Sequence, residues 1–318
     1  MNISRAARVS PLLKTLAAML TGFIAASGAH AATQTTASGF YKMKLGAVTV
    51  VALSDGVFAL PAGQFMVEAH KGEVQDALTK AHAGATVPTS VNAFLIDTGA
   101  KRILIDTGSG AFLGPTLGEV EKHLEAAGYQ PGQIDEVLIT HLHADHAGGL
   151  INNGQVVYPN ATVRVDENET HFWQDRTNIA KVDPSVQGTF DAVSAALTPY
   201  AASGHLETFH AGEQLEPGIT AVSEPGHTPG HTGYRVESDG QVLVVWGDLV
   251  HLAMVQLPDP KVTIKFDSSP ADAVAAREKA LADAARKGYL VAAAHIDFPG
   301  IGKVSKTGRG YVWTPVKP

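Results

Sequence analysis

A run of metal-ligand side chains at the end of an apolar strand constrains this chain more than any other feature. Residues 136–150 read EVLITHLHADHAGGL. The apolar segment 136–140 predicts a strand. Four ligand-type residues follow it within six positions: His141, His143, Asp145 and His146. Because histidine and carboxylate suit zinc and similar divalent ions, the run indicates a metal site rather than a solvated histidine cluster.

The spacing within this run limits how the side chains can be used. His141 and His143 lie two positions apart, so an extended segment points them to the same side. Asp145 and His146 then face a neighbouring position as a helix begins. Four ligands crowded so closely cannot comfortably surround a single tetrahedral ion. The run therefore needs partners from elsewhere in the chain.

Three further strand ends offer such partners. Segment 223–231, SEPGHTPGH, presents His227 and His231 in a Gly/Pro-rich loop. Asp248 ends the apolar segment VLVVWGD, where a lone carboxylate is costly unless it is paired or bound to a metal. His295 follows the apolar segment LVAAA in the same way. Each residue alone is weak evidence, but together with the run they form a strong constellation.

Composition excludes several other classes of site. The 318 residues include no cysteine, which removes thiol nucleophiles and cysteine metal ligands, so any metal must sit on nitrogen and oxygen. The net charge of −7 argues against a nucleic-acid binder, because that function needs a basic surface.

The N-terminus has the features of a secretory signal peptide. Basic residues Arg5, Arg8 and Lys14 precede an apolar stretch that is too short to span a membrane. It ends in Ala29-His30-Ala31, so we expect cleavage after Ala31 and a periplasmic or secreted mature protein. No apolar run of 18 residues predicts a spanning helix elsewhere. We expect residues 32–318 to form one domain.

Short apolar segments alternate with helical ones along this domain. The first half contains expected strands at 47–56, 91–97, 102–108 and 136–140 and an expected helix at 114–128. The second half contains expected strands at 218–226, 232–238, 241–248 and 289–295 and a helix at 268–288. Residues 166–205 are expected to form a flap or helical insert. Two sheets packed face to face, with helices outside, would bury both halves.

The segments THLHADHAGG, PGHTPGHT, GD and a late histidine resemble the metallo-β-lactamase superfamily, an α/β fold. This resemblance implies an αβ/βα sandwich of two mixed β-sheets with helices on the outer faces. It places His141, His143 and His227 on one metal ion. It places Asp145, His146 and His295 on a second, with Asp248 bridging both. We expect two Zn²⁺ ions and a bridging hydroxide as the nucleophile.

The resemblance also implies supporting roles. Asp145 and Asp248 are the expected catalytic carboxylates. Asp106 matches a strand-end aspartate behind the metal site. His231 either hydrogen-bonds a neighbour of the metals or packs within its loop.

The segments LGPTLG, AAGYQP, ADAARKGYL and HIDFPGIG extend the resemblance to the methyl parathion hydrolase group. That group includes exported enzymes that split organophosphate triesters and relatives that hydrolyse aryl lactones or aryl esters; its members often form homodimers. Two sets of residues fall where the group lines its substrate pocket. The first is Leu113, Trp173 and Phe190, of which Phe190 is equally expected in the core. The second is His251, Ile264 and Phe266.

The second set differs from the efficient organophosphate hydrolases, because His251 stands where an apolar residue is expected and Ile264 and Phe266 are bulky. The sequence therefore predicts a binuclear zinc hydrolase of neutral lactones or aryl esters, with side activity on organophosphate triesters. The first alternative is a phosphotriesterase. The second is a non-catalytic periplasmic zinc-binding protein, for which Asp248 would not be needed.

Overall fold

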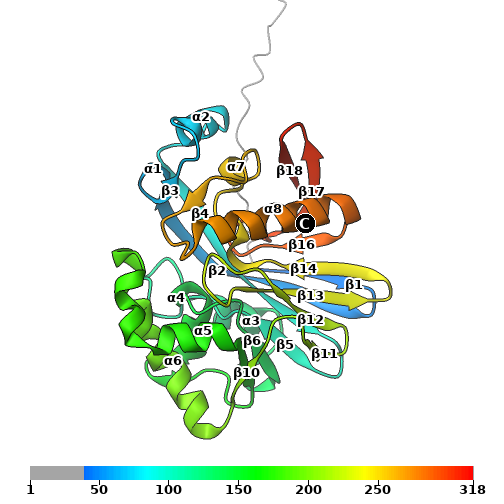
Figure 1. The fold of residues 1–318 in the computed structure, drawn as a ribbon. Coiled ribbons are helices and arrows are strands. Elements are labelled where there is room, and N and C mark those ends of the chain that lie inside the picture. The colour runs from blue at the N-terminus through cyan, green and yellow to red at the C-terminus, as the bar shows by residue number, and fades with distance from the viewer. Residues whose placement is uncertain (1–38, 318) are drawn as a thin grey trace, which may run out of the picture. The chain divides into compact units, whose positions relative to one another are not determined.

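The computed structural model describes residues 39–317, so the signal peptide expected over residues 1–31 lies outside the described part of the chain. Two seven-stranded sheets form the centre of the described part, and helices flank them (Figure 1). None of the helices in residues 39–317 combines the length and the apolar character that crossing a membrane requires.

The first sheet is built from the first half of the chain. Its strands lie in the order β1 (Phe40–Leu45), β2 (Val48–Pro61), β4 (Thr86–Asp97), β5 (Arg102–Ile105), β6 (Glu136–Leu138), β9 (Thr162–Asp166) and β10 (Leu206–Phe209). Neighbours from β1 to β5 are antiparallel, whereas β5, β6, β9 and β10 run parallel. The sheet is therefore mixed.

The second sheet comes from the second half. Its order is β11 (Gln214–Glu216), β12 (Ile219–Ser223), β13 (Thr232–Ser238), β14 (Gln241–Val245), β16 (Leu290–Ala292), β17 (Ile301–Thr307) and β18 (Gly310–Pro315). Only β14 and β16 are parallel neighbours, and α8 (Pro270–Lys287) connects them. Two short strand pairs complete the list: β3 (Met66–Val67) with β15 (Thr263–Ile264), and β7 (Ile151–Asn152) with β8 (Gln155–Val156).

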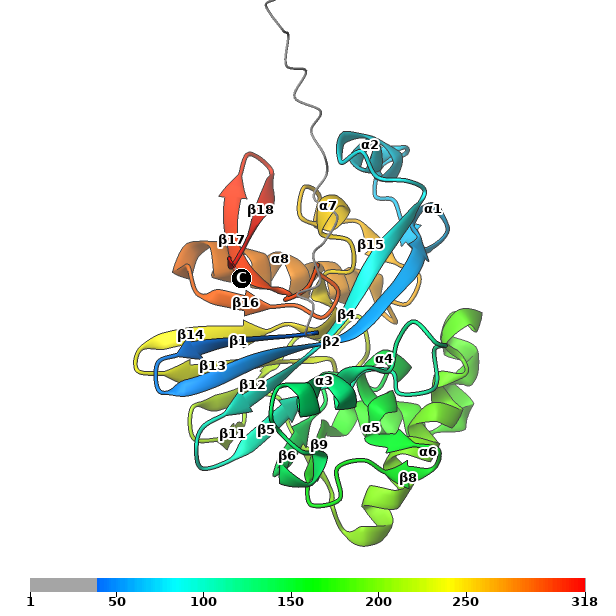
Figure 2. The ribbon, with the colours of Figure 1, turned by 180° about the vertical axis from the view of Figure 1, so that it is seen from behind.

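The sheets pack face to face and helices cover their outer faces. Successive side chains of β2 point to opposite sides, as in any strand. Val50 lies in the core between the sheets, while Val51 lies in the core beneath the helices of the first half. On the other side, Leu281 of α8 packs against Trp246. Both views place α8 opposite the helices of the first half (Figures 1 and 2). The expected αβ/βα sandwich is confirmed.

The first half supplies α3 (Val120–Ala126), α4 (Ala144–Ala147), α5 (Glu167–Gln174) and α6 (Thr189–Ser203). The segment 166–205, expected to be helical, contains α5 and α6. The helix expected at 114–128 is shorter than predicted, because Gly114 and Gly118 adopt left-handed φ angles of 93° and 91° that a helix cannot contain.

Other elements did not follow from the sequence pattern. The long pair β2 and β4 continues past the sheet as a two-stranded arm, and α1 (Ala62–Phe65), α2 (Glu73–Lys80) and α7 (Ala253–Gln256) gather around it. The C-terminal hairpin of β17 and β18 was also not predicted.

Candidate metal centre

The expected ligands come together where strands of both sheets end. His141 and His143 follow β6, and Asp145 and His146 lie in α4 immediately after them. From the second sheet, His227 follows β12, Asp248 follows β14 in a short turn, and His295 follows β16. Two groups of ligand atoms result, each with all atoms within 4.8 Å of one another. The groups are His141, His143, His227 and Asp248, and Asp145, His146, His295 and Asp248.

In the first group the side chains converge from both sheets. His143 Nδ1 lies 3.0 Å from His141 Nε2 and 3.0 Å from His227 Nε2. One oxygen of Asp248, Oδ2, lies 3.2 Å from His227 Nε2 and 3.6 Å from His141 Nε2. Three nitrogens and one oxygen thus surround a common point, which is a donor set suited to a tetrahedral divalent ion.

The second group uses the other oxygen of the same carboxylate. Asp248 Oδ1 lies 3.1 Å from His146 Nε2 and 3.1 Å from His295 Nε2. Asp145 Oδ2 lies 3.6 Å from His146 Nε2 and 3.5 Å from His295 Nε2. Asp248 Oδ2 also lies 3.1 Å from His295 Nε2. The Asp248 carboxylate therefore reaches both groups, so it can bridge two ions.

Most ligand histidines are held through their other ring nitrogen. Asp106 Oδ2 lies 2.9 Å from His146 Nδ1, and Asp267 Oδ1 lies 2.9 Å from His227 Nδ1. The main-chain oxygen of Ser90 accepts from His295 Nδ1 at 2.8 Å. Such partners fix the ring orientation and leave the opposite nitrogen free for a metal.

Asp106 takes the position behind the site expected for it, in a strained conformation. Its φ of 59° is unusual for a residue with a side chain. Its carboxylate accepts from the main-chain N–H and the hydroxyl of Thr140, both at 2.8 Å, in addition to holding His146. These bonds keep the turn before the ligand run in place.

Three residues that support the site were not found from the sequence. Asp267 holds His227, as described above. The Asn92 amide donates to the main-chain oxygens of Ala293 and Ile296, on either side of His295. Glu169 of α5 is fully buried and accepts the main-chain N–H groups of Leu142 and Gly230. Only tertiary packing brings these residues to the ligands, so no local pattern marks them.

His231 and His251 lie beside Asp248. His231 Nδ1 donates to the main-chain oxygen of Glu224 at 3.0 Å, so its Nε2 can accept the N–H of Asp248 at 2.9 Å. Burial lowers the pKa of His231 to about 3, which keeps this ring neutral. His251 Nε2 lies 3.1 Å from Asp248 Oδ2, and its ring stacks on that of His295 at 5.2 Å.

Burial and the buried carboxylates act on the ligand histidines in opposite directions, so that the pKa of His141 is lowered whereas those of His146 and His295 are raised. Burial lowers the pKa of His141 well below its usual range, so this ring is neutral as a ligand must be. Burial alone would raise the pKa of Asp248, but the charges of His146 and His295 outweigh it and hold that pKa well below normal. His146 Nε2 and Asp248 Oδ1 have no hydrogen-bond partner in residues 39–317, although they lie 3.1 Å apart. Both atoms are therefore available to an ion.

A cavity of about 330 Å³ opens above the two groups. His143, Asp145, Asp248, His251 and His295 form its polar floor. Its walls are largely apolar and come from the arm of β2 and β4, from α1 and from separate loops. The apolar wall residues are Phe58, Leu60, Phe65, Leu113, Leu117, Val186 and Phe266. Leu113, His251 and Phe266, three of the residues expected in a substrate pocket, thus line this cavity.

The other three residues expected in the pocket lie elsewhere. Trp173 and Phe190 are 1 % exposed and belong to the core beneath α5 and α6, where their rings pack at 4.8 Å. Trp173 contacts the edge of His143 from behind, with ring centres 5.3 Å apart. Ile264 pairs with Met66 and is buried in the arm. Trp173 and Ile264 therefore pack into cores rather than line this cavity, and Phe190 lies in the core, which was one of its two expected places.

Comparison with known proteins agrees with this architecture. The profile of the Metallo-beta-lactamase superfamily matches residues 86–295. The N-acyl homoserine lactonase of Bacillus thuringiensis is 27% identical over 209 residues, which are 59% of this chain and 73% of the lactonase. Ribonuclease TTHA0252 of Thermus thermophilus is 30% identical over 187 residues, or 56% of this chain, and the match spans only 39% of the ribonuclease.

Two solved structures are similar over most of the chain. The hydrolase AbOPH is 37% identical with a TM-score of 0.83, covering 88% of this chain and 98% of AbOPH. AidC, a dizinc quorum-quenching lactonase solved with a product, is 25% identical with a TM-score of 0.80 and the same coverage. The family profile extends from the start of β4 to His295. The chain therefore belongs to the metallo-beta-lactamase superfamily.

Proposed function

We propose that this protein is a binuclear metal-dependent hydrolase of lactones or aryl esters. The observation that carries the proposal is the division of Asp248 between two ligand groups at the floor of an apolar cavity. A purely structural metal site would be closed by protein ligands and would need no substrate-sized space above it. Here the floor of the cavity is the ligand set itself.

The chemistry follows from the donor set. Two divalent ions, which we propose to be Zn²⁺, would supply a water nucleophile at neutral pH and would polarise the attacked carbonyl. His141, His143 and His227 would hold one ion, and Asp145, His146 and His295 the other, with Asp248 between them. Asp145 is also the more accessible of the two carboxylates, since 17% of its side chain is exposed. We propose that the Asp145 carboxylate takes up the proton that the attacking water releases and returns it to the leaving oxygen.

The cavity favours a neutral substrate. No lysine or arginine is among the residues that line it, so it offers no fixed cation for a phosphate monoester or a nucleic acid. Its walls carry the rings of Phe58, Phe65 and Phe266, which can contact an aryl group or an acyl chain. Esters and lactones combine such an apolar part with one polarised carbonyl.

Lactones are the preferred substrate class within this proposal. Two of the proteins to which the chain is similar are described as lactonases, the enzyme of Bacillus thuringiensis and AidC. Organophosphate triesters are also neutral and would fit the same floor, so we propose side activity on them. A phosphotriesterase is the second candidate. His251 at the cavity floor is one difference from the organophosphate hydrolases, and it does not prevent a phosphotriester from reaching the metal ligands.

A substrate panel tests the proposal. The purified protein without residues 1–31 would be analysed for metal content and assayed with dihydrocoumarin, an acyl-homoserine lactone and methyl paraoxon. We expect two metal ions per chain and the highest kcat/KM for a lactone, and we expect Asp248→Asn to lose both metal and activity. A preference for methyl paraoxon would replace the lactonase proposal with the phosphotriesterase. Full activity with one ion per chain would refute the binuclear mechanism.

Export to the periplasm and homodimer formation stay predictions of the sequence. Edman sequencing of the protein secreted by a bacterial host would locate the cleavage site, and light scattering would give the mass in solution.

A further inference from the structure

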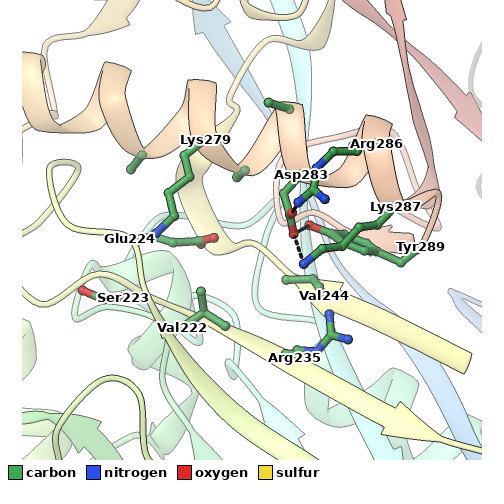
Figure 3. Close-up of a pocket in the computed structure, with 13 residues that line it drawn as sticks. Val222, Ser223, Glu224, Arg235, Val244, Lys279, Asp283, Arg286, Lys287 and Tyr289 are labelled. Carbon is green, nitrogen blue, oxygen red and sulfur yellow. Dashed lines mark hydrogen bonds and ion pairs between the residues drawn. The ribbon is translucent and has the colours of Figure 1, made fainter. Parts of the chain in front are cut away.

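A second cavity lies between α8 and the outer face of the second sheet (Figure 3). Its volume is about 590 Å³, larger than the 330 Å³ of the cavity above the metal ligands. Side chains of β12, β13, β14 and α8 line it, and none of them lines the metal cavity. It is therefore separate from the proposed active site.

A buried carboxyl group without a partner faces this cavity. Glu224 is only 6 % exposed, and its Oε2 has no hydrogen-bond partner within residues 39–317. A Cβ atom placed on Gly233 would lie 2.5 Å from this oxygen, so the carboxyl occupies space that the absent side chain leaves on the neighbouring strand. Figure 3 shows the carboxyl between the strands and Lys279. An unsatisfied polar atom in such a position is costly unless a ligand or water completes it.

The charges around the cavity are mainly positive, although the whole chain carries −7. The basic lining residues are Arg235, Lys279, Arg286 and Lys287, and the acidic ones are Glu224 and Asp283. Asp283 already pairs with Arg286 and Lys287 on α8. Burial raises the pKa of Glu224 well above its usual value, and only the charge of Lys279 opposes this. This shift favours the protonated carboxyl, which can donate a hydrogen bond, and the positive charge beside it is that of Lys279.

The remaining walls are apolar. Val222 and Val244 form the floor on the sheet, and Ala276 and Ala280 of α8 lie across from them. Because these helix side chains are small, space remains between α8 and the sheet. A ligand that matches this space has an apolar body and one negatively charged end, because a cation would meet the Lys279 ammonium, whereas Arg235 is already paired with Glu237 at 2.8 Å.

We propose that this cavity binds a small amphipathic carboxylate. The apolar chain or ring would lie between Val244 and the alanines of α8, and its carboxylate would accept from the Lys279 ammonium and the Glu224 carboxyl. Such a ligand could be the acid released by ester hydrolysis or a free fatty acid, since both have the same chemistry. None of the lining residues is a metal ligand, and Glu224 reaches the metal centre only through its main-chain oxygen, which accepts from His231. Binding of a fatty acid therefore does not depend on the proposed function, whereas binding of a reaction product rests on it.

Calorimetric titration of the metal-loaded protein tests the charge and shape of the ligand. Octanoate, octylammonium and octanol have the same chain with a negative, positive or neutral end. We expect octanoate to bind at least tenfold more tightly than the other two. Comparing octanoate with 4-hydroxyoctanoate, the acid formed from the corresponding lactone, identifies the source: tighter binding of the hydroxy acid indicates the reaction product, and tighter binding of octanoate indicates a fatty acid.

Variants separate this site from carboxylate binding at the metals. Ala276→Trp fills the cavity and should abolish the titrated site, while Lys279→Met should weaken it about tenfold. Glu224→Leu should weaken it similarly and Glu224→Gln should retain it, because an amide still donates. Lys80→Met, which changes an exposed lysine of the distant helix α2, is the matched control and should bind normally. Lactone hydrolysis by each variant verifies that the metal centre is intact.

Two results would overturn the proposal. One is tighter binding of octylammonium than of octanoate. The other is a failure at the octanoate site itself: either octanoate does not bind, or its binding is unchanged in both Ala276→Trp and Lys279→Met while hydrolysis remains normal.

Discussion

Glu169 is expected to hold together the two loops that carry the first group of metal ligands. Its Oε2 accepts the N–H of Leu142 at 3.1 Å, within the run from His141 to His146, and the indole N–H of Trp173 at 2.8 Å. Its Oε1 accepts the N–H of Gly230 at 3.0 Å, within the loop that carries His227. One fully buried carboxyl therefore connects loops from both sheets and the ring behind His143.

The cost of removing this carboxyl can be worked out from its donors. Glu169→Ala leaves three buried N–H groups without an acceptor, each worth roughly 1–3 kcal/mol. Water that enters the vacated space would accept from some of these N–H groups and offset part of this cost. We therefore expect a loss of about 3–6 kcal/mol in the free energy of unfolding. Glu169→Gln keeps the shape and one acceptor oxygen. Its amide nitrogen would face the Gly230 N–H, for a loss of about 1–3 kcal/mol.

Urea unfolding of the metal-loaded variants measures the first effect, and competition with a chelator measures metal affinity. We expect both to fall in the order wild type, Glu169→Gln, Glu169→Ala, because the loops that hold His141, His143 and His227 lose their common anchor. Glu167→Gln is the matched control on the same helix, since Glu167 contacts only exposed histidines and should change stability by less than about 0.5 kcal/mol. Wild-type stability and metal affinity in Glu169→Gln would refute the reasoning.

Three further predictions concern the metals, the cavity floor and pH. Chelation should abolish hydrolysis and Zn²⁺ should restore it, and activity in a preparation shown to be metal-free would contradict the mechanism. His251→Leu should raise kcat/KM for methyl paraoxon relative to dihydrocoumarin, because an apolar side chain replaces the ring beside Asp248; an unchanged ratio would remove His251 from substrate selection. Burial raises the pKa of Glu224 above the 4.5 of an ordinary glutamate, so the folded state binds the extra proton and loses stability as pH rises above about 4.5. Urea midpoints of the wild type should therefore fall relative to Glu224→Gln as the pH rises above about 4.5, and parallel curves would show that Glu224 titrates normally.

The strands that end at the candidate metal centre, and the polar residues that follow them, could be predicted from the sequence for one physical reason. A buried strand is apolar, and a polar residue directly after it must be accounted for by a partner or a metal. Asp248 and His295 both follow such strands, and β14 and β16 are parallel neighbours, so their carboxyl ends meet. The ligand run after β6 reaches the same edge from the first sheet. Local pattern and topology agree at this position, and the constellation could be recognised without coordinates.

The supporting residues depend on contacts that no local pattern records. Glu169 lies 27 residues from Leu142 and 61 from Gly230, and Asp267 lies 40 from His227. Each occupies an ordinary position in sequence, within a helix or a loop. Trp173 shows the reverse error, because an aromatic residue near the site was expected in the pocket but packs behind His143 instead.

The cavity wall was hardest to predict, because its two sides are joined by the short strands β3 and β15. These strands pair over only two residues each, although they lie nearly 200 residues apart in the sequence. Met66 and Ile264 lie opposite each other in the β3–β15 pair, and the rings of Phe65 and Phe266 lie with their centres 5.0 Å apart. Ile264 is 1 % exposed beneath this pair, so it acts on the cavity only by supporting Phe266. We therefore expect substrate selection in the proposed pocket to depend on how the arm of β2 and β4 packs on the loop before α8. A substitution at Ile264 should alter it through the position of Phe266 rather than through contact with the substrate.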